Sequence, residues 1–294
     1  MKPSSSVGTL AIIGGSKAYQ LLQEGRLGGE RLGEVKTPYG PSQPVYRLGG
    51  ELAGALFLSR HGERGYTVSA PFVNYRANIY ALKELGAQCV LSWSGPGAIG
   101  RDFAIGQYVV VDDLVDETCE RESTFFKGKG WGFVRQNPVF CPTLRQALCR
   151  ALNALGLPFA ERGTYVCTQG PRLETPAEIR KFASFGCDLV GMTLCPEVFL
   201  AKELEMCYAA ICYVTNYAEG IRERAFKPGE LFEGLSTEAE QKAVAAAVEQ
   251  FPAILSAVAK ALACAKPVCQ CHRLMERYRK RGDVGGNWHT WVAV

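Results

Sequence analysis

Short apolar runs alternate along this chain with segments in which apolar residues recur every three or four positions. Runs that read as buried strands lie at residues 9–13, 89–93, 164–168 and 208–215. The last of these is almost continuously apolar, so we expect it to be a central strand covered on both faces. Shorter strands are expected at residues 45–48, 55–59 and 106–112.

Helices are predicted between these strands. Thr175 can cap a helix with its hydroxyl, Pro176 suits the first helical position, and Glu178 completes a capping box. Other segments show helical spacing of apolar residues, with an interruption expected at Pro252 in the last one. These segments are 72–85, 142–155, 196–204 and 237–264.

The alternation of strands and helices predicts one α/β domain. The chain has 294 residues, of which 47% are hydrophobic, and this is ample material for a large core. After Lys266-Pro267 the composition becomes rich in cysteine and basic residues. We therefore predict a domain at residues 1–266 and a separate tail at residues 267–294.

Charge and composition exclude several classes of protein. The net charge of +4 is spread along most of the chain, which argues against a nucleic-acid partner. No apolar run approaches the roughly 20 residues of a membrane span, and Met1 to Val7 lacks the features of a signal peptide. Nine of the twelve cysteines are scattered singly between Cys89 and Cys212, where free thiols pack as small hydrophobes. We expect a reduced, cytoplasmic protein.

The tail contains a Cys269-x-Cys271 pair close to Cys264 and His272. Cysteine and histidine are zinc ligands, so this group is a candidate metal site. The spacing differs from a zinc finger and a second pair of ligands is missing, so we predict no metal. The basic run that follows, residues 273–281, is typical of a solvated or partner-contacting face.

Small and polar residues follow the ends of several predicted strands. Gly14-Gly15-Ser16 follows one strand, Arg60-His61 a second, and Ser94-Gly95 a third. Backbone amides at a helix start, an arginine fork and a hydroxyl all suit phosphate oxygens. Taken alone, an Arg-His pair is better explained by an ion pair at a strand end. A Rossmann site is disfavoured, because GGSKAY lacks the GxGxxG spacing.

Two long motifs carry a resemblance to a known family. GTYVCTQGPRLETPAE at residues 163–178 and GCDLVGMTLCPEVFLAKE at residues 186–203 are similar to motifs of the trimeric purine nucleoside phosphorylases and the 5′-methylthioadenosine phosphorylases. The resemblance extends from about residue 8 to about residue 265. It implies one α/β domain with a central mixed, partly barrel-like sheet flanked by helices. It also implies a homotrimer or a dimer of trimers.

The resemblance assigns roles to residues at the strand ends. It implies that phosphate is bound by Ser16, Arg60, His61, Ser94, Gly95 and Thr193. It implies that the nucleoside is bound by Glu174, Met192, Asn216, Tyr217, Ala218 and Pro228. Among these, it makes His61, Glu174 and Asn216 the catalytic residues. Trp93 and Pro96 depart from the family pattern around Ser94.

The choice of purine base depends on two positions. Relatives that cleave 6-aminopurine nucleosides carry aspartate where this chain has Asn216 and Ala218. An amide cannot protonate N7, but it can donate a hydrogen bond to N7 or to a 6-oxo group. Glu174 can accept hydrogen bonds from N1–H and a 2-amino group, and a mismatch there costs ~10⁴ in selectivity. We therefore predict phosphorolysis of inosine and guanosine to the free base and ribose 1-phosphate.

Other functions stay open. The segment at residues 226–232 has no histidine for a 5′-hydroxyl, and its Pro228, Leu231 and Phe232 could suit a methylthio group. A 5′-methylthioinosine or 5′-methylthioadenosine phosphorylase is therefore the main alternative. A hydrolytic nucleosidase and a non-catalytic purine-binding regulator are alternatives of other classes. The predicted reaction needs inorganic phosphate as a co-substrate and no cofactor.

Overall fold

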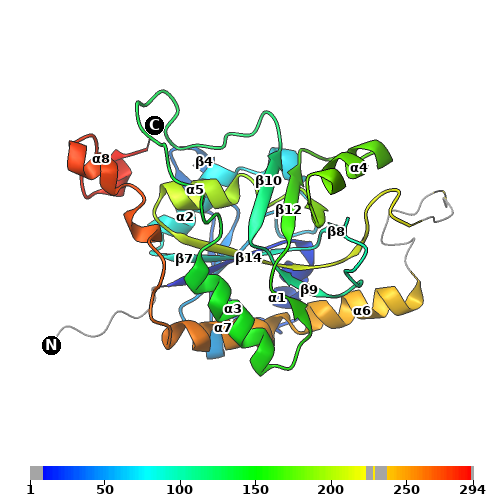
Figure 1. The fold of residues 1–294 in the computed structure, drawn as a ribbon. Coiled ribbons are helices and arrows are strands. Elements are labelled where there is room, and N and C mark those ends of the chain that lie inside the picture. The colour runs from blue at the N-terminus through cyan, green and yellow to red at the C-terminus, as the bar shows by residue number, and fades with distance from the viewer. Residues whose placement is uncertain (1–8, 223–227, 229–236, 293–294) are drawn as a thin grey trace.

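The fold is built on an eight-stranded mixed sheet (Figure 1). The computed structural model describes residues 9–222, 228 and 237–292. Four neighbouring strands are parallel, in the order β14 (Cys207–Tyr213), β7 (Cys89–Ser94), β1 (Leu10–Gly14) and β6 (Leu56–Ser59). Next to β14 the sheet continues with β9 (Tyr108–Val110), which is antiparallel to β14, and then with β11 (Phe159–Ala160). Next to β6 it continues with β5 (Val45–Leu48) and then with β2 (Gly29–Gly33).

A second sheet holds five short strands. Their order is β10 (Asp113–Glu117), β12 (Thr164–Thr168), β13 (Leu189–Gly191), β8 (Gly97–Ala98) and β15 (Asn216–Tyr217). The chain passes from the large sheet into the small one four times, from β7 to β8, β9 to β10, β11 to β12 and β14 to β15. The two sheets therefore belong to one domain with a large mixed sheet, as the family resemblance implied. A separate two-stranded sheet is formed by β3 (Lys36–Thr37) and β4 (Gly40–Pro41).

Helices cover both faces of the large sheet (Figure 1). One face packs on α2 (Tyr75–Glu84) and α5 (Glu197–Glu203), and the other on α1 (Ser16–Gln23), α3 (Pro142–Ala154) and α7 (Phe251–Ala263). The small sheet is covered by α4 (Pro176–Ser184), which buries Ile179 and Phe182 against it. Strand β14 is buried along almost its whole length, as its apolar sequence predicted.

Two helix boundaries test the reading of the sequence. The Thr175 hydroxyl accepts from the Glu178 amide, and the Glu178 carboxylate accepts from the Thr175 amide, so the predicted capping box of α4 is confirmed. The interruption predicted at Pro252 is displaced. The helix breaks at Gln250, and Pro252 lies in the first turn of α7, where no amide hydrogen is needed.

The helical segment Glu238–Ala263 combines α6 (Glu238–Glu249) with α7. By length and composition it could cross a membrane, with a mean hydropathy of 1.3, so the expectation that no segment approaches this limit is wrong. Its most apolar face is buried against the sheet and α3, through Phe251, Ile254, Leu255 and Val258. Only 28% of the apolar window is buried, so the segment is an amphipathic helical region that packs on the sheet with one face.

The tail after residue 266 folds back onto the domain and contains the short helix α8 (Glu276–Arg281), drawn in red in Figure 1. Met275, Tyr278 and Trp291 are buried in the same apolar cluster as α2 and α5. Both Nη atoms of Arg279 lie 2.8 Å from the carboxylate oxygens of Glu205. The prediction of a solvated or partner-contacting basic face is therefore wrong for Arg279, which binds its own chain.

Candidate active site

A cavity of about 890 Å³ lies where the parallel strands of the large sheet end. Neighbouring parallel strands present their carboxyl ends at one edge of a sheet, and ligands of α/β proteins bind there. The residues that follow β1, β6, β7 and β14 line the cavity, namely Gly15, Arg60, Gly95 and Thr215. The loops after β12 and β13 add Glu174, Met192 and Thr193. The volume suits a small-molecule site.

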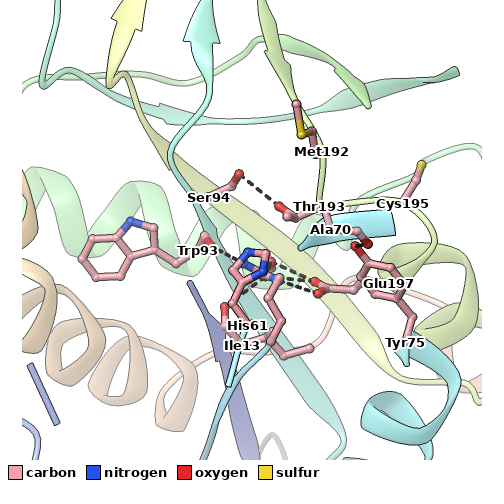
Figure 2. A network of polar contacts seen from close by, with 12 residues as sticks. Ile13, His61, Ala70, Tyr75, Trp93, Ser94, Met192, Thr193, Cys195 and Glu197 are labelled. Atoms are coloured by element: carbon pink, nitrogen blue, oxygen red, sulfur yellow. Dashed lines mark hydrogen bonds and ion pairs between the residues drawn. The ribbon is translucent and has the colours of Figure 1, made fainter. Parts of the chain in front are cut away.

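Arg60 lines this cavity but is only 1% exposed. Its Nε and Nη2 atoms bind both carboxylate oxygens of Glu197, at 2.7 and 3.1 Å. The remaining contacts run to Ser92 Oγ and to the carbonyl oxygens of Trp93 and Ile13 (Figure 2). Burial opposes the charge, but Glu197 outweighs it and raises the pKa of Arg60 above its ordinary value. The guanidinium is permanently charged.

This arrangement corrects the expected role of the Arg60 fork. A buried cation needs a buried anion, and Glu197 takes the bidentate side of the guanidinium. Guanidinium has five N–H groups, so one Nη1 hydrogen remains for a ligand. Arg60 can therefore give an anion one hydrogen bond, and cannot grip it with two parallel bonds.

His61 is buried next to Arg60 and also lines the cavity. Its Nδ1 atom lies 2.8 Å from the carbonyl oxygen of Val68. A carbonyl oxygen only accepts, so Nδ1 carries the hydrogen and Nε2 of the neutral ring is an acceptor. Burial first, and then the charge of Arg60, lower the pKa of His61 to about 4. The ring is neutral at pH 7.

Two hydroxyl groups meet in the cavity wall. Ser94 Oγ, at the end of β7, lies 3.3 Å from Thr193 Oγ1 and 3.3 Å from the hydroxyl of the fully buried Tyr165. Figure 2 shows Ser94 and Thr193 pointing toward one another, with Met192 beyond them. The next residue must be glycine, because a Cβ atom at Gly95 would lie 2.7 Å from Thr215 Cγ2. These hydroxyls suit an oxyanion.

The Asn216 amide is held in one orientation. Thr215 Oγ1 donates to Asn216 Oδ1 at 2.8 Å, and Asn216 Nδ2 donates to the Tyr217 carbonyl oxygen at 2.9 Å. The amide nitrogen has two hydrogens, so one remains for a ligand. Asn216 and Arg60 line the same cavity, as the predicted site requires.

Glu174 lines the cavity from the turn that precedes α4. The hydroxyl of Thr168, at the end of β12, donates to its Oε1 atom. A carboxylate has about four acceptor positions, so most of them remain available. Glu174 can therefore accept hydrogen bonds from a ligand while one oxygen is held in place.

Only some of the other predicted site residues line the cavity. Met192 and Ala218 line the cavity. Tyr217 is not among the lining residues, and its ring instead lies 3.7 Å from the guanidinium of Arg222. Pro228 is exposed and is not among the lining residues, and the segments on both sides of it lie outside the described residues, so its place in the site stays a prediction. Ser16 begins α1, directly after the lining residue Gly15.

Sequence reasoning missed residues that hold the site together. Glu197 lies in the motif at residues 186–203, but no function was predicted for it. A carboxylate inside an apolar helix is nevertheless a signal of a buried ion pair. Thr215 and Arg121 carried no signal. Arg121 donates to the carbonyl oxygens of Met192 and Gln169, at 2.7 and 2.6 Å, and so ties the loops after β13 and β12 together.

Comparison with known proteins places this geometry in a family. The sequence profile of the phosphorylase superfamily matches residues 9–260. A 6-oxopurine nucleoside phosphorylase of Pyrococcus furiosus is 40% identical over 252 residues, which cover 83% of this chain and 93% of the relative. A probable S-methyl-5′-thioinosine phosphorylase of Methanothermobacter thermautotrophicus is 42% identical over 226 residues, 76% of this chain and 77% of the relative.

A solved structure is similar over most of the fold. The methylthioadenosine phosphorylase of Schistosoma mansoni in complex with adenine aligns with a TM-score of 0.72 and 29% identity. The alignment covers 86% of this chain and 91% of the other. Most of the chain matches in sequence and in fold, and the chain therefore belongs to the phosphorylase superfamily as one of its nucleoside phosphorylases.

Proposed function

We propose that this enzyme cleaves 6-oxopurine nucleosides with inorganic phosphate, releasing the free base and ribose 1-phosphate. The single observation that carries the proposal is the fixed amide of Asn216. Its Nδ2 atom donates one hydrogen to the Tyr217 carbonyl oxygen, which fixes the amide, and the second Nδ2 hydrogen remains for a ligand in the cavity that Asn216 lines. A donor stabilises negative charge at N7 or at a 6-oxo group, whereas a 6-aminopurine needs a proton at N7.

Glu174 supports the same choice of base. Its carboxylate lines the cavity that Asn216 also lines, and Thr168 holds one of its oxygens. Hypoxanthine and guanine present N1–H, and guanine adds a 2-amino group, so both can donate to a carboxylate. Adenine has no hydrogen on N1. A partly buried acceptor that the base leaves without a donor disfavours adenine.

Phosphate is assigned to the wall formed by Ser94, Thr193 and His61. The two hydroxyls can donate to phosphate oxygens, as can the remaining Nη1 hydrogen of Arg60. The Nε2 acceptor of neutral His61 suits the P–OH group of monohydrogen phosphate. These contacts orient a weak nucleophile without converting it into another species.

The reaction then follows from the positions of these groups. A phosphate oxygen forms a bond to C1′ of the ribose as the bond from C1′ to N9 breaks. The electron pair of that bond moves onto the purine, where the Asn216 N–H stabilises the charge before solvent supplies a proton. The sugar passes through an oxocarbenium-like state, so alignment and electrostatic stabilisation supply the acceleration. The proposal needs no cofactor.

A 5′-methylthio substrate is the second candidate. One relative is named as a probable S-methyl-5′-thioinosine phosphorylase. The apolar side chains Val244 and Val248 of α6 line another part of the cavity, where they could receive an apolar 5′ group. The predicted 5′ segment, residues 226–232, lies outside the described residues except for Pro228.

Base release separates these functions. Inosine, guanosine, adenosine and methylthioinosine are each incubated with the enzyme, with and without phosphate. We expect inosine and guanosine to react only with phosphate, and adenosine to react ~10⁴ less efficiently. Release without phosphate would indicate a nucleosidase, and binding without release a purine-binding regulator. A higher kcat/KM for methylthioinosine than for inosine would select the second candidate.

The assembly and the location are proposed on resemblance alone. We infer a homotrimer, or a dimer of trimers, acting in the cytoplasm. Light scattering on the purified enzyme measures the number of chains directly. A monomer that retains full activity would contradict the proposed assembly.

A further inference from the structure

Four cysteines from three separate parts of the chain meet far from the cavity. Cys141 directly precedes α3, Cys207 is the first residue of β14, and Cys269 and Cys271 belong to the tail. Their four sulfur atoms all lie within 4.8 Å of one another. The distance between the sulfurs of Cys207 and Cys269 is 3.6 Å. All four are free thiols in this structure.

These distances match a tetrahedral thiolate site for one metal ion. Zinc binds thiolate sulfur at about 2.3 Å, so two sulfurs of a zinc tetrahedron lie about 3.8 Å apart. A disulfide would bring its two sulfurs to about 2.05 Å. A [4Fe–4S] cluster would spread the sulfurs further apart, since each cysteine binds a different iron. The cluster therefore fits a single ion.

The surroundings hold the tail cysteines in place. Thr143 Oγ1, in the first turn of α3, accepts hydrogen bonds from the amides of Val268 and Cys269, at 2.9 and 3.1 Å. The buried ammonium of Lys202 donates to the carbonyl oxygen of Pro138 and lies within electrostatic range of Cys141 and Cys271. A nearby cation offsets part of the negative charge that four thiolates around Zn²⁺ carry.

We propose that Cys141, Cys207, Cys269 and Cys271 bind one Zn²⁺ ion, which fastens the tail to the catalytic domain. This reverses the prediction of no metal, which rested on the lack of a second ligand pair. Cys141 and Cys207 are that pair, and their distance in sequence hid them. Cys264 and His272, the partners considered from sequence, are exposed and lie outside the cluster.

The site is structural, because it lies at the wrong end of the sheet for catalysis. Cys207 begins β14, and Asn216 follows the other end of that strand. At about 3.3 Å per residue, a strand of seven residues separates its ends by roughly 20 Å. The ion would join the start of β14, the start of α3 and the tail, three segments that lie far apart in the sequence.

Metal analysis of the full-length chain tests the proposal. The protein is expressed in zinc-supplemented medium, purified under reducing conditions, and measured by inductively coupled plasma mass spectrometry. We expect one zinc per chain in the wild type and in Cys264→Ser, the matched control in the same tail. We expect less than about 0.1 zinc per chain in Cys271→Ser. Cobalt substitution of the wild type should give the absorption of a tetrahedral cobalt thiolate.

Measurements on the wild type keep the proposal falsifiable if Cys271→Ser does not fold. A thiol-binding mercurial should release one zinc per chain, and zinc removal should lower the Tm by at least about 10 °C. Metal-free protein with an unchanged Tm would overturn the proposal. So would disulfides among the four cysteines in protein alkylated directly in the lysate, or a full zinc content in Cys271→Ser.

Discussion

Asn216 presents a fixed hydrogen-bond donor because its two neighbours set the orientation of the amide. Nδ2 faces the carbonyl oxygen of Tyr217, which only accepts hydrogen bonds, and Oδ1 faces the hydroxyl of Thr215. In the reversed orientation the amide oxygen would face a carbonyl oxygen, so the second Nδ2 hydrogen is the group that remains for the base. This donor and the Glu174 carboxylate both favour the proposed 6-oxopurine activity over a 6-aminopurine activity, which requires an acid at N7.

Asn216→Asp should change the choice of base. A carboxylic acid can protonate N7 of adenine, so we expect the ratio of kcat/KM for adenosine to that for inosine to rise by about 10². The matched control is Asn153→Asp on the exposed face of α3, which should leave the ratio unchanged. Steady-state kinetics with both nucleosides measure the effect. An unchanged ratio in Asn216→Asp would contradict the role given to the amide.

The ion pair of Arg60 and Glu197 predicts a large loss of stability for one conservative substitution. Glu197→Gln leaves a buried cation without its counter-charge, which costs about 3–5 kcal/mol in the free energy of unfolding. Glu51→Gln removes the partner of Lys260 in a solvent-exposed pair and should change the stability little. Urea unfolding compares the two variants. Equal losses would show that Glu197 does not compensate Arg60.

Among the elements, α4 links a helix start to the binding of the base. Its capping box lies directly after Glu174, so the cap and the carboxylate share one turn. Thr175→Ala should cost about 1 kcal/mol of stability and raise the KM for guanosine several-fold, because the turn that carries Glu174 loosens. Thr237→Ala removes the same cap from α6 and is the control. Thr237→Ala should lower the stability by a similar amount and leave the KM for guanosine unchanged. A similar rise in KM in both variants would contradict the proposed link between the α4 cap and Glu174.

The elements were largely predictable because their signals are local. The capping box at Thr175 and the apolar run of β14 each depend on a few adjacent residues, and both agree with the structure. The site was predictable only where long motifs implied it. The sequence around Glu197 signals a buried partner but does not identify Arg60, which lies 137 positions away. Arg121 binds Met192, which lies 71 positions away, and carries no local signal.

The cysteine cluster could not be predicted from local sequence either, because most of its members lie far apart along the chain. Cys141 and Cys269 are separated by more than 120 residues, and the fold alone makes them neighbours. Spacing rules for metal sites depend on ligands that are close in sequence. A site assembled from a helix start, a strand start and a tail cannot satisfy them. Its residues can be predicted only once the topology is known.

At the scale of the whole molecule, the buried side chains of His61 and Glu203 change the stability with pH in opposite directions. Burial, followed by the charge of Arg60, lowers the pKa of His61 to about 4. Burial raises the pKa of Glu203 to about 7. Between about pH 4.5 and 6.5, unfolding takes up a proton at His61, so stability rises with pH. In the same range unfolding releases a proton at Glu203, so stability falls with pH.

Removing the Glu203 carboxyl group should reveal the effect of His61 on the dependence of stability on pH. In the wild type the two effects nearly cancel between pH 4.5 and 6.5. Glu203→Gln removes only the falling contribution, so its stability relative to the wild type should increase by about 2 kcal/mol across this range. Urea unfolding at several pH values measures the slope, which is independent of any constant loss from the altered hydrogen bonds of Glu203. Glu30→Gln, on the exposed edge strand β2, is the control. Parallel profiles for Glu203→Gln and the wild type would contradict this prediction. They would mean that the Glu203 carboxyl group is ionised in the folded protein at pH 6.5, because its hydrogen bonds offset the effect of burial.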